Sequence, residues 1–239
     1  MITPFTDLAS DAQIRGFLHE CSEPNGDAVV LTHGAGANCQ SHLLVELSGA
    51  FEAAGFAVLR FDLPFRTEHP HGPPRPGEAA RDREGLRRAV ALMKERPRPN
   101  SKTLKTQEEC ARIFLGGHSY GGRQATMLVA EAASSNVPPV DGLVLLSYPL
   151  HPPRKPEQLR TGHFSKLSTP AFFVHGTRDP FGTIAEMNSA LKLIPAPHAL
   201  LEVEGAGHDL LGKKGANDLP ARIVSEFRSF LRASLQVGT

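Results

Sequence analysis

The chain has 239 residues, of which 40% are hydrophobic and 21% charged, and its 26 Lys+Arg nearly balance its 25 Asp+Glu, for a formal net charge of +1. These values predict a single soluble domain over residues 1–239 and give no indication of a nucleic-acid or membrane-surface partner. The amino terminus lacks a basic stretch followed by an apolar run, and no later segment approaches the roughly 20 apolar residues of a membrane span, so we expect a cytoplasmic protein.

Short apolar runs recur along the chain and alternate with longer segments of helical periodicity. This alternation is typical of an α/β fold with a mostly parallel sheet flanked by helices. Several runs are apolar throughout, as expected for strands that are covered on both faces. The predicted strands are residues 14–21, 28–32, 57–61, 111–115, 142–147, 171–175 and 199–203.

The segments between these strands predict crossover helices. Residues 42–54 carry apolar side chains at steps of three and four, as do residues 80–94, and a last helix over 220–235 begins with Pro220 in its first turn. Residues 64–78 contain too many prolines for a helix or a central strand, and residues 96–107 are also polar and interrupted by proline. Residues 149–168 follow a strand, and we expect at most one short helix there and therefore little or no lid.

The stretch FLGGHSYGG places Ser119 among glycines, after an apolar run and before a segment of helical periodicity. In a strand–turn–helix context, G-x-S-x-G predicts a sharp turn that holds the serine in an unfavourable backbone conformation with its hydroxyl exposed. Glycine at 117 and 121 avoids collisions with the neighbouring strand and helix. The pattern therefore predicts Ser119 as a nucleophile.

A serine nucleophile needs a general base and an acid that orients this base. GTRDPFG places Asp179 after one later strand, and EGAGHDL places His208 after the next. Ser, then Asp, then His is the chain order expected on such a sheet, so we predict a triad of Ser119, His208 and Asp179. Asp62 precedes the serine and Asp209 adjoins His208, so both are weaker candidates for the acid.

Two backbone N–H groups are predicted to stabilise the oxyanion. The strand over residues 28–32 leads directly into HGAGANCQSH, where Gly34 and Gly36 allow the main chain to turn. We predict the N–H of Ala35 in this loop and the N–H of Tyr120, after the nucleophile, as the donor pair.

Other polar residues near the predicted site are given less specific roles. Arg66 and Arg178 are candidates to contact an acidic substrate, whereas Arg123 is expected to bind loop carbonyls. His33 is expected to brace its own loop and His118 to pack inside the turn. We predict solvated side chains for the remaining loop histidines His69, His71, His151 and His163.

Neither a metal nor a cofactor is predicted. HPHGPP and HPP lack the spacing and the cysteine partners of a zinc site. Cys21, Cys39 and Cys110 are widely spaced and odd in number, so we expect reduced thiols and no disulfide framework.

The motifs HGAGAN, RFDLPF, GGHSYGGR, LSYPLHPPRKPEQLRTGH and GTRDPFG occur in this order along the chain. Together they resemble the α/β-hydrolase superfamily, and more narrowly a dienelactone-hydrolase-related branch with animal testis-expressed and chromatin-complex relatives. The resemblance implies the α/β-hydrolase sheet order and a triad at Ser119, Asp179 and His208. Dienelactone hydrolases proper use a cysteine nucleophile, so their lactone chemistry is not implied.

These features predict a carboxylesterase-like serine hydrolase that cleaves an ester or related acyl bond of a small molecule through an acyl-enzyme. Thioester cleavage, amide cleavage and acyl transfer use the same groups and remain open, as does the oligomeric state. The alternative is a catalytically silent binding or scaffold protein that keeps the fold.

Overall fold

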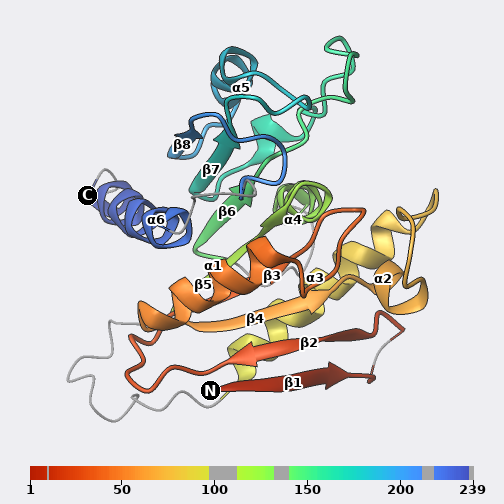
Figure 1. Cartoon of the computed structure of the whole chain (residues 1–239), viewed down its shortest axis with the longest axis vertical. Coiled ribbons are helices and arrows are strands. Elements are labelled where there is room, and N and C mark those ends of the chain that lie inside the picture. Colours follow the sequence, from red (N-terminus) through yellow and green to blue (C-terminus); the bar gives the residue numbers. More distant parts are fainter. Residues whose placement is uncertain (10, 97–111, 132–139, 212–217, 237–239) are drawn as a thin grey trace.

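The structure, a computed structural model, describes residues 1–9, 11–96, 112–131, 140–211 and 218–236. One 8-stranded sheet in the order β1-β2-β4-β3-β5-β6-β7-β8 runs through the molecule (Figure 1). Its strands are β1 (Ile2–Asp7), β2 (Ile14–His19), β3 (Ala28–Thr32), β4 (Ala57–Asp62), β5 (Ile113–His118), β6 (Gly142–Leu146), β7 (Ala171–Gly176) and β8 (His198–Val203).

Helices cover the sheet. They are α1 (His42–Ala53), α2 (Pro64–Glu68), α3 (Ala79–Glu95), α4 (Tyr120–Glu131), α5 (Ile184–Leu191) and α6 (Leu219–Gln236), with a short 3₁₀ helix η2 (Phe164–Lys166). All neighbouring strands from β4 to β8 pair in parallel, whereas β1 with β2 and β2 with β4 pair antiparallel. The predicted mostly parallel α/β sheet is therefore confirmed.

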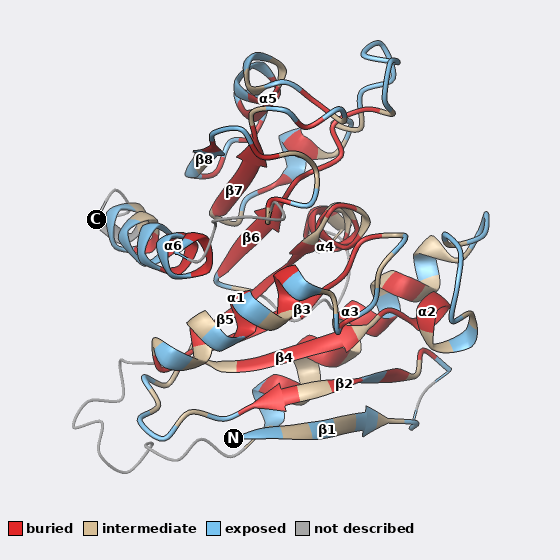
Figure 2. Cartoon of the chain, viewed as in Figure 1, coloured by how far each residue is buried: buried red, intermediate tan, exposed pale blue. Residues whose placement is uncertain are grey.

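Two apolar cores lie on opposite faces of the sheet, and Figure 2 shows the buried residues concentrated on its central strands. One core joins the sheet to α3, α4 and α5 through residues such as Leu86, Leu128 and Met187. The other joins it to α1 and α6, for example through Leu47 and Phe227. Strands β3, β6 and β7 are buried along their whole length, which explains why their sequences are apolar at every position.

The predicted strands agree with the observed ones to within a few residues, except that the start predicted at residue 111 lies outside the described residues. Two elements, β1 and α5, were missed, and a third, α2, lies in a segment that was assigned wrongly. Strand β1 alternates between exposed and half-buried residues at the sheet edge, so it has no apolar run. Helix α5 is short, although Thr183 and Glu186 form a capping box at its start.

The prediction that residues 64–78 contain no helix was wrong. Helix α2 begins with Pro64 in its first turn, where the fixed φ of proline suits a helix and its missing N–H costs nothing. The segment follows β4 and therefore starts at the carboxyl edge of the sheet. The predicted polar segment 96–107 lies, except for Arg96, outside the described residues, as does Cys110.

Parallel strands bring their carboxyl ends to one edge of the sheet, where active sites of such folds are built. The segments that follow β3, β5, β7 and β8 carry Ala35, Ser119, Asp179 and His208 respectively. Residues 149–168 hold only the 3₁₀ helix η2, as expected for a chain with little lid. Among the described residues, no helix combines the length and apolar character of a membrane span.

Candidate active site

Ser119 lies at the junction of β5 and α4 with a φ of +50°, in the left-handed region that non-glycine residues rarely adopt. Its N–H donates to the carbonyl oxygen of Leu146 at 2.8 Å, which fixes the turn against β6. Ser119 is 9% exposed, so its hydroxyl is less open to solvent than the sequence pattern predicts. The strained conformation agrees with the sharp turn predicted from the glycines.

The flanking glycines are required by close backbone contacts. A Cβ atom at Gly117 would lie 2.6 Å from the carbonyl oxygen of Thr32, and one at Gly121 would lie 2.6 Å from that of His33. Both separations are well inside van der Waals contact. Side chains at these positions would push β3 and its following loop away from the turn that carries Ser119.

Ser119, His208 and Asp179 form one hydrogen-bonded chain. The Ser119 Oγ and His208 Nε2 atoms are 2.8 Å apart, and the His208 Nδ1 and Asp179 Oδ2 atoms are also 2.8 Å apart. A nucleophile bonded to a base, and a base bonded to an orienting acid, is the arrangement of serine hydrolases. The fold thus assembles three side chains that lie far apart in the sequence.

The Asp179 side chain is fully buried, and its second oxygen accepts the N–H of Phe181 at 2.9 Å. Burial raises the pKa of this carboxyl group, but the hydrogen bonds from His208 and from the Phe181 N–H lower the pKa below its ordinary value. The group is therefore ionised at neutral pH. An ionised Asp179 accepts the Nδ1 hydrogen of His208, which leaves Nε2 as the acceptor of a hydrogen bond from the Ser119 hydroxyl.

Phe181 and His118 hold His208 in place. The Phe181 ring lies against the His208 ring with centroids 4.2 Å apart and an interplanar angle of 30°. The Nε2 of His118 lies 2.7 Å from the backbone carbonyl oxygen of His208, and the centroids of these two rings are 5.1 Å apart. Burial lowers the pKa of His118 to about 4, so this ring is neutral and donates one N–H to the carbonyl. His118 packs inside the turn as predicted and also anchors the His208 backbone.

The loop after β3 lies beside Ser119, because a Cβ atom at Gly34 would come within 3.3 Å of the Ser119 Cβ. Within the described part of the chain, no hydrogen bond is found for the N–H of Ala35. Tyr120 is the first residue of α4, where a backbone N–H has no partner within the helix. Its hydroxyl donates to the buried Asp82 at 2.7 Å, which fixes the residue.

Arg66 has a different role from the predicted substrate contact. It is 6% exposed, and its N–H groups donate to four carbonyl oxygens at 2.8 Å, those of Ala35, Ala37, His69 and Gly72. The guanidinium therefore joins the loop after β3 to residues 64–78 and orients the peptide groups around Ala35. Arg178 is exposed, and its predicted contact with an acidic substrate stays a prediction.

His71 is exposed as predicted, but two of the other histidines are less solvated than predicted. His33 accepts the N–H of Leu63 at 3.1 Å and lies 2.8 Å from the carbonyl of Gly34, so its predicted bracing role is confirmed. The predictions for His151 and His163 were wrong. His151 is 5% exposed, and His163 is half-buried with its Nε2 atom 2.8 Å from the Thr126 hydroxyl.

The imidazoles of His118 and His163 are expected to make the protein less stable in acid. Burial is the first cause that lowers the pKa of His118 and of His163, each to about 4, whereas an unfolded histidine titrates near pH 6.5. Between these values the unfolded chain binds more protons, so the free energy of unfolding falls as the pH falls, by about 1.4 kcal/mol per pH unit for each such group.

Urea denaturation over this pH range measures how steeply the free energy of unfolding depends on pH. His163→Gln, which keeps a donor for Thr126 but cannot titrate, is expected to reduce this slope. His42→Gln, which removes a ring with 76% side-chain exposure, is the matched control. An unchanged slope in His163→Gln would contradict the account.

One group of described residues has ligand atoms close enough to hold a metal ion. These are Glu68, His69 and Glu78, whose atoms lie within 4.8 Å of one another. Glu68 already pairs with Arg81, and Glu78 accepts the backbone N–H of Arg75, so internal partners occupy both carboxylates. The group lies at the surface and contributes nothing to the triad.

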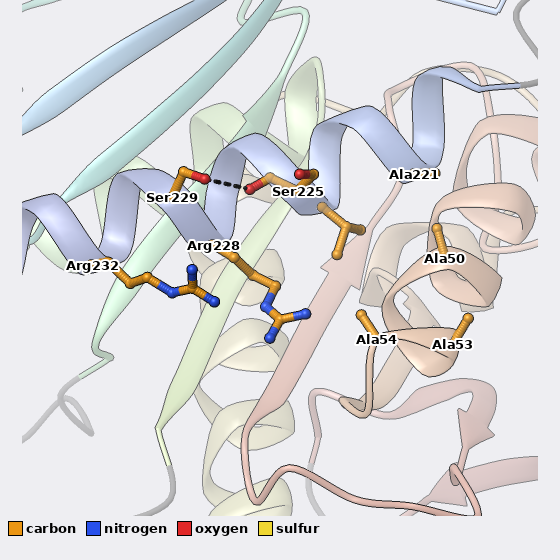
Figure 3. A pocket seen from close by; sticks show the side chains of 9 residues that line it. Ala50, Ala53, Ala54, Ala221, Ser225, Arg228, Ser229 and Arg232 are labelled. Carbon is orange, nitrogen blue, oxygen red and sulfur yellow. Dashed lines mark hydrogen bonds between the residues drawn. The ribbon is translucent and has the colours of Figure 1, made fainter.

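A groove of about 330 Å³ lies between α1 and α6 (Figure 3). Small side chains such as Ala50, Ala54 and Ala221 line it together with Arg228 and Arg232. No residue of the triad contributes to this groove, so it is separate from the candidate active site.

Comparison with known proteins agrees with this architecture. A family model described as an alpha/beta hydrolase domain matches residues 25–229. Dienelactone hydrolase from Anabaena variabilis ATCC 29413 is 21% identical, with 95% of each chain covered and a TM-score of 0.68. Est1E from Butyrivibrio proteoclasticus with ferulic acid bound is 15% identical, with 96% of this chain and 99% of that chain covered and a TM-score of 0.70.

An alpha-beta serine hydrolase homologue from Coxiella burnetii is also similar. It is 14% identical, with 97% of this chain and 96% of that chain covered and a TM-score of 0.67. At these identities the solved structures show a shared fold, and what each of them binds or cleaves belongs to that protein.

Proposed function

Because the chain belongs to the α/β-hydrolase domain family, we propose that it is a serine hydrolase that cleaves a carboxylic ester or a related acyl bond. The single observation that carries this proposal is the chain of hydrogen bonds from Ser119 through His208 to Asp179. Similar structures described as esterases support it further.

In the proposed reaction the Ser119 Oγ attacks the acyl carbon while its proton passes to His208 Nε2. The bond to the leaving group then breaks, and His208 returns that proton to the departing oxygen, which leaves an acyl-enzyme. Water repeats the attack with His208 as base, and the carboxylic acid product and the free serine are released. The N–H groups of Ala35 and Tyr120 stabilise the oxyanion of each tetrahedral intermediate.

The alternative is a binding or scaffold protein that keeps the fold without catalysis. Ser119 stands against this alternative because its backbone conformation is strained and costs stability, of order 1–3 kcal/mol for such a residue. A scaffold gains nothing from this cost. The hydrolase reading explains both the strain and the alignment of His208.

Acylation by p-nitrophenyl acetate tests the proposal. The wild type is expected to release a burst of about one equivalent of p-nitrophenolate and to carry one acetyl group on Ser119 by intact mass and peptide mapping. Ser147→Ala is the matched control, because Ser147 is a buried serine that also has positive φ at the end of a neighbouring strand. Acetylation that persists in Ser119→Ala would overturn the proposal.

A further inference from the structure

Two arginines and a histidine gather around Tyr148, beside the turn that carries Ser119. Arg123 lies in α4, and its backbone N–H donates to the carbonyl oxygen of Ser119 at 2.9 Å. Arg160 and His163 come from the segment between β6 and η2, which packs on α4. Within this cluster, Arg123 acts electrostatically on Arg160, on His163 and on Tyr148.

Backbone and neutral groups fix the positions of these residues. The Tyr148 hydroxyl donates to the backbone carbonyl oxygen of Arg160 at 2.7 Å. The backbone N–H of Arg160 in turn donates to the carbonyl oxygen of Leu150 at 2.8 Å. The Thr126 hydroxyl donates to the carbonyl oxygen of Arg123 and accepts from His163, both at 2.8 Å. The cluster is therefore ordered without a hydrogen bond or ion pair between the two guanidinium groups and an acid among residues 1–9, 11–96, 112–131, 140–211 and 218–236.

The Arg123 side chain donates a hydrogen bond to the Tyr148 hydroxyl, but both guanidinium groups keep hydrogen-bonding capacity that the described residues do not use. The Nε of Arg123 is buried and has no partner. The side chain of Arg160 makes one long contact, 3.4 Å from Nη1 to the carbonyl oxygen of Pro149. Burial and then the charge of Arg123 lower the pKa of Arg160, and no carboxylate contributes to this shift. Two half-buried positive charges without a carboxylate partner are unfavourable, and a bound anion would stabilise both guanidinium groups.

Arg66 shows the contrast. Its N–H groups are occupied by four carbonyl oxygens, one of them that of Ala35 in the loop after β3. Residues that only brace loops use their donors in this way. Arg123 was predicted from the sequence to bind loop carbonyls, and the unpartnered Nε differs from that prediction.

We propose that Arg123 and Arg160 form an anion subsite that binds a carboxylate or phosphate group of the acyl substrate. This inference rests on the proposed function of Ser119. Arg123 lies next to Ser119, because its backbone N–H donates to the Ser119 carbonyl oxygen at 2.9 Å. A planar guanidinium binds such oxyanions with two parallel hydrogen bonds, so the subsite selects acyl groups that carry a second, anionic end.

The test compares p-nitrophenyl half-esters of glutarate and adipate with the valerate and hexanoate esters of the same chain length. The wild type is expected to hydrolyse the acidic esters with roughly ten- to hundredfold higher kcat/KM, the range given by hydrogen bonds to a charged group. Arg160→Gln and Arg123→Gln are expected to reduce this ratio towards one. Arg160→Lys keeps the charge but not the planar guanidinium group, so its ratio is expected to lie between those of the wild type and Arg160→Gln.

Lys155→Gln is the matched control, because it removes an exposed cation from the same segment and should leave the ratio unchanged. Thermal unfolding of each variant shows that it is folded. A wild type that is acetylated on Ser119 and hydrolyses these esters, but does not prefer the acidic ones, would overturn the anion subsite and leave the hydrolase proposal intact.

Binding provides a readout that does not depend on catalysis. Succinate and inorganic phosphate, added separately, are expected to raise the Tm of the wild type but not that of Arg160→Gln, and the stronger of the two identifies the anion. If the protein hydrolyses no ester, a Tm increase that Arg160→Gln abolishes supports the anion subsite on its own. The absence of any increase with either anion would overturn it.

Discussion

Replacing His208 with alanine is expected to lower kcat for a p-nitrophenyl ester by roughly 10⁴- to 10⁶-fold, because triad members act as a unit and removing the base costs about as much as removing the nucleophile. The Nε2 of His208 lies 2.8 Å from the Ser119 oxygen, and in the described part of the chain no other base is bonded to this oxygen. Without His208, the Ser119 proton has no acceptor in the site.

The control for this variant is His42→Ala, which removes an exposed ring from α1. Steady-state kinetics and thermal unfolding are measured for both variants. The account expects full activity in His42→Ala and a folded, inactive His208→Ala. A His208→Ala enzyme that turns over at the wild-type rate would contradict the assignment of the base.

Asp179→Asn is the second large effect, with an expected loss of about 10⁴-fold in kcat. The carboxylate accepts the Nδ1 hydrogen of His208 at 2.8 Å and fixes which ring nitrogen faces Ser119. An amide that turns its NH₂ group towards the ring would stabilise the wrong tautomer. The reaction therefore loses its base even though the side chains keep their size.

Asp209→Asn is the matched control, because Asp209 adjoins His208 in sequence but is exposed. The same kinetic comparison decides between the two acids. If Asp209→Asn loses activity and Asp179→Asn keeps it, the orienting acid has been assigned wrongly. The structure favours Asp179, since its buried carboxylate is the one bonded to the ring.

The interior of the fold could be predicted from sequence because buried parallel strands are apolar at every position. The observed β3 has the predicted bounds, and β6 and β7 differ from their predictions by one residue at one end. Strand β1 could not be found in this way, since it lies at the sheet edge and is recognisable only by its pairing with β2. Helix α5 is only 8 residues long, which is too short for a clear periodic signal.

The proximity of Ser119, Asp179 and His208 could be predicted because each follows a strand at the same edge of the sheet and in the expected chain order. The roles of the arginines could not be predicted. Whether Arg66 binds a substrate or four carbonyl oxygens depends on how residues 64–78 approach the loop after β3. The effect of the Arg123 charge on Arg160 depends likewise on how the segment after β6 packs on α4.

The most direct test of the central claim is labelling with a fluorophosphonate, which reacts with activated serines whatever the natural substrate. Intact mass is measured for the wild type and for Ser119→Ala after exposure to the reagent. We expect one adduct on the wild type and none on the variant. A folded wild-type protein that stays unlabelled, or a variant that is labelled as fast as the wild type, would contradict it.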